Sequence, residues 1–173
     1  MLKLVGACLI LGASLLYGYM LRVRLSDHVG QLIGMKEMLL MLAGEISYTR
    51  TPLGEAFLHM IAQGKEPYKT MLTAVRYQME HGEVGKPLHQ IWKEVIDLQS
   101  RNFLLSDEEV AILQNAGNNF GYLDASMQLK NIEVYIQQVE VKIVQAQNEL
   151  AAKQKVYQYL SVMCGLFFII MLL

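Results

Sequence analysis

The sequence predicts an all-α protein, an antiparallel bundle of about six helices flanked by an N-terminal and a C-terminal transmembrane helix. Of the 173 residues, 53% are hydrophobic and only 18% are charged, and all 16 acidic residues lie between Asp27 and Glu149. The chain has only 3 prolines, and its apolar residues recur at spacings of three and four, as on one face of a helix. This length and composition favour one domain between two apolar ends and exclude a disordered chain.

The two ends of the chain are uncharged runs of 18 residues, Leu4–Leu21 and Val156–Leu173. At a rise of 1.5 Å per residue each run would span roughly 27 Å, close to the roughly 30 Å of bilayer hydrocarbon. The alternatives are a buried core helix and, for the first run, a secretory signal, although no small-residue cleavage site follows it. We therefore expect three parts: a transmembrane helix at 1–21, a helical bundle at 22–155 and a transmembrane helix at 156–173.

Basic residues predict the side of the membrane on which the middle region lies. Only Lys3 lies on the outer side of the two runs, whereas six basic residues lie within about 15 residues of a run on the middle side. Positive charge next to membrane segments favours the cytoplasmic side, so we expect a membrane protein with a cytoplasmic bundle. The six residues are Arg22, Arg24, Lys36, Lys142, Lys153 and Lys155.

The middle region predicts five helices joined by short turns. The first begins near Ser26 or Asp27, and Pro52, Pro67 and Pro87 begin the next three, because proline is favoured in the first turn of a helix. These four helices end near Ile46, Ala62, His81 and Leu98, and Ser106-Asp107-Glu108-Glu109 is a capping box for the fifth. The expected buried residues are Leu32, Met35, Leu39, Leu42 and Ile46 in the first, Tyr68, Met71, Leu72, Val75 and Met79 in the third, and Leu88, Ile91, Trp92, Val95, Ile96 and Leu98 in the fourth.

The sixth predicted helix is the longest. Apolar residues alternate at spacings of three and four from Leu129 to Leu150, and neither proline nor glycine lies between Tyr122 and Cys164. We therefore expect one helix that runs from the bundle into the membrane, on the order of 75 Å long. The bundle core accounts for the apolar stripe up to about Gln145, and beyond it we expect a partner helix.

Motifs for catalysis are missing from the sequence. The four histidines have no metal-binding spacing, and both cysteines, Cys8 and Cys164, lie in the apolar runs. The Gly-Lys pairs at Gly64 and Gly85 lack the frame of a phosphate-binding loop. We therefore expect no enzyme, no cofactor and no metal site, and the net charge of −1 gives no reason to expect a nucleic-acid partner.

One turn carries a more specific pattern. Gly117-Asn118-Asn119-Phe120-Gly121-Tyr122-Leu123-Asp124 ends the fifth predicted helix and begins the long one. Gly117 and Gly121 can take positive φ, and Asp124 would lie in the first turn of the long helix. We expect these three residues to shape the junction, and a plain glycine turn is the alternative.

This turn resembles the G-E-x-[ST]-G-x-L-D turn of type II secretion F proteins, from which Asn118 and Phe120 depart. Pro52-Leu53-Gly54-Glu55-Ala56-Phe57 resembles the P-L-x-E-A-L helix start of the same proteins. With Glu45-Ile46-Ser47-Tyr48 before that start and an apolar run at each end, the whole chain resembles the stage III sporulation protein AB family.

The resemblance implies a non-catalytic membrane platform in the channel complex that links mother cell and forespore during endospore formation. It implies a place in the mother-cell membrane around the forespore. The implied partners are other channel proteins and a cytoplasmic assembly ATPase, and a homo-oligomer is compatible with it. The residues alone predict a membrane-anchored helical scaffold, with a small membrane enzyme and a signalling or assembly adaptor outside any channel as the alternatives.

Three turns are predicted to contact a cytoplasmic partner, on the expectation that they lie at the end of the bundle far from the membrane. Between Leu25 and Lys155 there are 16 acidic and 12 basic residues, so the exposed bundle is mildly acidic. Ordinary solvated turns are the alternative. The candidate contact residues are Lys65, Glu66, Glu83, Lys86, Arg101 and Asp107.

Overall fold

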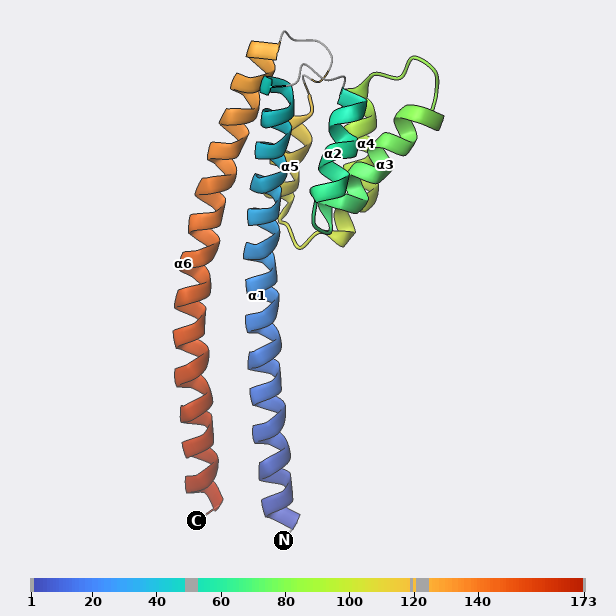
Figure 1. Cartoon of the computed structure of the whole chain (residues 1–173). Coiled ribbons are helices and arrows are strands. Elements are labelled where there is room, and N and C mark those ends of the chain that lie inside the picture. The colour runs from blue at the N-terminus through green and yellow to red at the C-terminus, as the bar shows by residue number, and fades with distance from the viewer. Residues whose placement is uncertain (1, 49–52, 119, 121–124, 173) are drawn as a thin grey trace. The chain divides into compact units, whose positions relative to one another are not determined.

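The computed structural model is helical throughout the residues that it describes, which are 2–48, 53–118, 120 and 125–172, and contains no strand within them (Figure 1). The all-α prediction is therefore confirmed for these ranges. They form two compact units, one of Met1–Val29 with Val144–Leu173 and one of Gly30–Ile143. The elements are α1 (Leu2–Tyr48), α2 (Leu53–Gln63), α3 (Tyr68–His81), α4 (Leu88–Gln99), the 3-10 turn η1 (Ser100–Asn102), α5 (Asp107–Ala116) and α6 (Ala125–Leu172).

α1 is one helix where the sequence predicted two. The expected break between Leu21 and Asp27 is wrong, because the helix continues through this segment. No proline or glycine lies between Met20 and Val29. Ser26 and Asp27 cost at most about 0.7 kcal/mol each in a helix interior, which is too little to end a helix supported on both sides. α6 continues without interruption to Leu172, as predicted for the long helix.

The first unit consists of the two terminal segments of the chain. Val144–Leu173 groups with Met1–Val29, and the partner helix expected for α6 beyond Gln145 remains a prediction. On α6, Lys153 donates a hydrogen bond to Glu149 at 2.9 Å, and this bond lowers the pKa of the Glu149 carboxyl. Among the described residues, no helix has the length and apolar character needed to cross a membrane. The two membrane spans therefore remain a prediction.

The second unit is built around one tryptophan. Trp92 of α4 is fully buried, stacks against Phe57 of α2 with ring centroids 6.3 Å apart, and meets Phe120 edge-on at 5.2 Å. Its indole N–H donates to the carbonyl oxygen of Leu113 in α5 at 2.9 Å. These contacts join α2, α4 and α5 in one core. The whole predicted stripe of α1 is also buried, namely Leu32, Met35, Leu39, Leu42 and Ile46.

Three residues of the buried stripes predicted for α3 and α4 are not buried. Leu98 is 79% exposed because it lies two residues beyond Ile96, about 200° around the helix from that buried side chain. Met79 is 37% exposed in the last turn of α3, and Leu88 in the first turn of α4 is half-buried. The helix ends were predicted well: α3 ends at His81 before Gly82, and Ser106 and Glu109 form the expected capping box of α5.

Candidate functional site

The structure distributes the three candidate turns over both ends of the bundle. The hydroxyl of Tyr68 donates to the carbonyl oxygen of Gln31 at 2.9 Å, and the backbone N–H of Leu104 donates to the side chain of Gln31 at 2.7 Å. The turns before α3 and before α5 therefore lie together beside α1. The 82–87 turn lies at the opposite ends of α3 and α4 (Figure 1). Consecutive antiparallel helices alternate in direction, so the three turns do not share one end, a point that the sequence left open.

Three of the six charged residues of these turns are engaged within the bundle. Lys65 pairs with Glu37 of α1 at 3.1 Å, and Glu66 accepts hydrogen bonds from Thr70. Lys86 pairs with Glu94 at 2.6 Å, and this hydrogen bond raises the pKa of the Lys86 ammonium. Glu83, Arg101 and Asp107 are exposed, and Asp107 lies in the first turn of α5. Contact of the six residues with a partner remains a prediction.

Gly117 is required for a reason other than the one expected from the sequence. Its φ of −88° and ψ of −8° lie in the right-handed helical region, so positive φ at this position is wrong. A Cβ atom at Gly117 would instead lie 2.2 Å from Cδ1 of Trp92. Among the described residues, the positive-φ glycine is Gly85, at 87°. The other two residues of the predicted junction, Gly121 and Asp124, lie outside the described residues.

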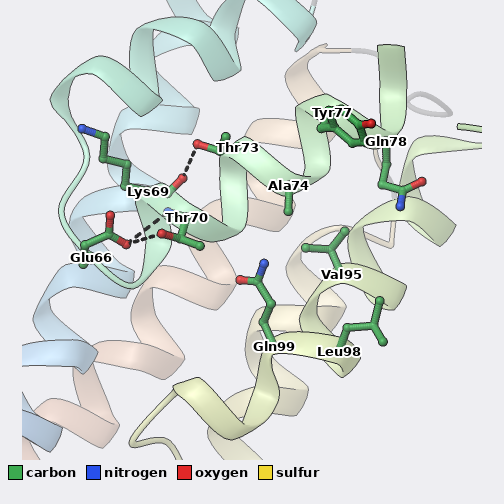
Figure 2. A pocket seen from close by; sticks show the side chains of 10 residues that line it. All are labelled: Glu66, Lys69, Thr70, Thr73, Ala74, Tyr77, Gln78, Val95, Leu98 and Gln99. Carbon is green, nitrogen blue, oxygen red and sulfur yellow. Dashed lines mark hydrogen bonds between the residues drawn. The ribbon is translucent and has the colours of Figure 1, made fainter. Parts of the chain in front are cut away.

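An open groove lies between α3 and α4 on the described surface of the bundle. It encloses about 530 Å³, and we name it the α3–α4 groove (Figure 2). α3 and α4 are short amphipathic helices that bury one side against α1, α2 and α5 and leave the other side open. The groove is lined by Glu66, Lys69, Thr70, Thr73, Ala74, Tyr77, Gln78, Val95, Leu98 and Gln99.

The groove combines an apolar floor with fixed polar walls. Val95 is 4% exposed and forms part of the floor, whereas Tyr77 is 60% and Leu98 79% exposed. Thr70 donates to Glu66 at 2.6 Å and Thr73 donates to the carbonyl oxygen of Lys69 at 2.8 Å, as the dashed lines in Figure 2 show. Both hydroxyl hydrogens are thus used within α3 and the turn before it.

Sequence reasoning missed this groove because Leu98 was assigned to the core. The spacing held the necessary signal, since a residue two positions beyond Ile96 must face away from it. Tyr77 is also held in place, because its ring stacks on His81 with centroids 4.6 Å apart.

No group of three or more histidine, cysteine or acidic side chains comes together to hold a metal in the part of the chain that the structure describes.

Three comparisons with known proteins agree on one family. The family model for stage III sporulation protein AB matches residues 3–173. The stage III sporulation protein AB of Bacillus subtilis (strain 168) is 25% identical over 173 residues, which cover all of both chains. A solved structure of a stage III sporulation protein AB superposes with a TM-score of 0.66 at 22% identity, covering 72% of this chain and 97% of that chain. The structural likeness supports the helical fold.

Proposed function

We propose, since this chain belongs to the stage III sporulation protein AB family, that it is a non-catalytic platform component of the mother cell-forespore channel complex. Family membership gives the chain a role in sporulation. The observation that carries the proposal is the family match over residues 3–173, which includes both apolar ends as well as the bundle. In this proposal the chain is anchored in the mother-cell membrane by 1–21 and 156–173, and the bundle is cytoplasmic.

The surface of the bundle supports a scaffold rather than an enzyme. Some of its charged residues form ion pairs between helices, such as Lys36 with Glu140 at 2.5 Å and Lys142 with Glu108 at 2.5 Å. The α3–α4 groove presents apolar, amide, hydroxyl and charged side chains, which can bind a partner, and the hydroxyls of Thr70 and Thr73 already donate to Glu66 and to the carbonyl oxygen of Lys69. A platform needs such a surface and a rigid core beneath it.

A cytoplasmic assembly ATPase is the partner that we propose for the 82–87 turn. This turn lies at the end of the bundle away from Gln31, and Val84 at its tip is fully exposed. Gly85, with φ of 87°, shapes the turn, and the pairing of Lys86 with Glu94 fixes its second half on α4. An exposed apolar side chain on a fixed turn is suited to enter a pocket of a partner.

Cysteine labelling in intact cells tests the membrane arrangement. Cys8 and Cys164 are replaced by alanine, and a single cysteine is placed either at Gln99 or after Leu173. We expect a membrane-impermeant maleimide to label only the cysteine after Leu173 until the cells are permeabilised. Equal labelling at Gln99 in intact cells would contradict a cytoplasmic bundle.

Binding of the purified full-length chain in detergent to the assembly ATPase tests the contact. Reversing the charges of Glu83 and Lys86 together with Val84→Asp should abolish binding. The matched control reverses Lys65 and Glu66 at the opposite end of α3, and it should bind like the unaltered chain. Binding that survives the first change and is lost in the control would place the contact at the other end of the bundle.

A further inference from the structure

Three apolar residues lie in one line on the solvent-facing side of α6, where a helix usually carries charged residues. Met127, Val134 and Val141 follow one another at intervals of seven residues and are 59%, 49% and 56% exposed. The buried line of the same helix is Ile132, Ile136, Val139 and Ile143. Val134 lies about 200° around the helix from Ile132, directly opposite the core. We name this face, with Lys130, Gln137 and Gln138 between the apolar residues, the α6 seam.

Two of the charged residues next to the α6 seam are drawn toward the bundle, whereas Glu133, next to Val134, is exposed. Glu140 pairs with Lys36 of α1 at 2.5 Å, and Lys142 pairs with Glu108 of α5 at 2.5 Å. What remains on the seam is apolar or uncharged, apart from Lys130. Single exposed apolar residues are common on any protein, but three in one line at heptad spacing are not explained by chance exposure. Depletion of charge is also what distinguishes the centre of a protein interface from the rest of a surface.

We propose that the α6 seam is the contact between two copies of this chain, which pair in parallel along α6. In a symmetric parallel pair each seam residue faces itself. Valine and methionine pack well against themselves, and a glutamine amide can both donate to and accept from an identical amide. A charge at the centre would repel itself, and the flexible stem of Lys130 lets its ammonium turn out to solvent. The composition of the seam is thus matched to its own copy.

The two valines of the α6 seam also favour a pair of chains. β-Branched residues at the first core position of a heptad favour two-stranded parallel pairing, and Val134 and Val141 occupy equivalent positions one heptad apart. The parallel direction rests on the proposed function, because two copies anchored in one membrane from the same side have α6 pointing the same way. The seam from Met127 to Val141 is only about 21 Å long, so it pairs weakly alone and relies on the high local concentration that a shared membrane provides.

Disulfide crosslinking of the full-length chain in membranes tests the pairing. Cys8 and Cys164 are replaced by alanine, and Val134→Cys, Val141→Cys and the control Val84→Cys are oxidised separately. A disulfide requires Cα atoms roughly 4.4–6.8 Å apart, which a parallel pair provides at both seam positions. We expect disulfide-linked dimers from Val134→Cys and Val141→Cys and none from Val84→Cys. Crosslinking of Val134→Cys without Val141→Cys would overturn the parallel pairing, and equal crosslinking of all three would overturn the seam.

Charge substitution gives a second test that does not depend on cysteine chemistry. Val134→Glu places like charges opposite each other and should abolish the dimer measured by light scattering of the full-length chain in nanodiscs. Val84→Glu, the same substitution at a more exposed position away from the seam, should leave the dimer intact. A dimer that survives Val134→Glu would overturn the proposal.

Alkaline extraction of the same membranes separates this inference from the proposed function. A chain that stays in alkali-washed membranes but yields no seam crosslinks contradicts only the pairing. A chain that is extracted by alkali contradicts only the anchoring, provided that both seam positions still crosslink.

Discussion

The contact between Gly117 and Trp92 leaves no room for a single methyl group. In Gly117→Ala, the new Cβ atom would lie 2.2 Å from Cδ1, 2.5 Å from Cγ and 2.6 Å from Nε1 of the indole. The indole cannot move aside freely, because Phe57 and Phe120 pack against it and its N–H bonds to Leu113. The substitution must therefore displace the largest side chain of the core.

Two energetic costs add up to the loss of stability expected for Gly117→Ala. Overpacking a well-packed core costs about 1–3 kcal/mol, and loss of the indole hydrogen bond adds about 1 kcal/mol. We therefore expect Gly117→Ala to lower the free energy of unfolding by about 2–4 kcal/mol, a large part of the 5–15 kcal/mol typical of a domain. The backbone contributes little, because alanine readily adopts the φ of −88° found at Gly117.

Denaturant unfolding followed by tryptophan fluorescence measures this effect directly, because Trp92 is the single tryptophan of the chain and lies in the core. The matched control is Gly44→Ala in α1, where a Cβ would meet nothing within 4 Å. This change should be neutral or stabilise by about 0.5–1 kcal/mol, since alanine is favoured over glycine in helices. If Gly117→Ala lies within about 0.5 kcal/mol of the unaltered chain while Gly44→Ala behaves as expected, the steric argument is refuted.

The remaining predictions concern Tyr68, Ser106 and Gly85. Burial, followed by the charge of Glu109, raises the pKa of Tyr68, so its contribution to stability is complete below the ordinary tyrosine pKa of about 10 and is lost as the pH rises through the raised value. Unfolding between pH 8 and 12 should therefore show a smaller alkaline loss for Tyr68→Phe, and equal losses would contradict this cause. Ser106→Ala removes the capping box of α5 and should cost about 1 kcal/mol in the same unfolding assay, with no loss arguing against the cap. Gly85→Ala should cost about 1–2 kcal/mol because of its φ of 87°, although no atom lies within 4 Å of the new methyl group, and a neutral result would show that the turn can adjust.

Local signals were sufficient for most of the helix boundaries. Pro67 and Pro87 immediately precede α3 and α4, and the Ser106 capping box precedes α5, because these residues act within a turn of their own position. The continuity of α1 was not predictable in the same way. The competing signals at Ser26 and Asp27 are worth only tenths of a kcal/mol, so the outcome is decided by the structure on both sides.

The parts of the site that the sequence did not reveal depend on contacts between distant residues. Trp92 and Gly117 are 25 positions apart, and no periodicity predicts that an indole ring will occupy the space beside one particular glycine. The separation of the 82–87 turn from the other two turns could have been predicted, since it follows from the alternation of antiparallel helices. The exposure of Leu98 could also have been predicted from its angular distance to Ile96.

Purification of the full-length tagged chain from solubilised membranes of sporulating cells tests the central claim, that this chain is a platform in a membrane assembly, most directly. The expected result is a large complex in which other membrane proteins of the channel and a cytoplasmic ATPase are recovered with the chain by mass spectrometry. The ATPase alone should be lost when Glu83 and Lys86 are reversed together with Val84→Asp, and it should be retained when Lys65 and Glu66 are reversed. Recovery of the unaltered chain from the soluble fraction, or from membranes with no other membrane protein bound, would contradict the platform.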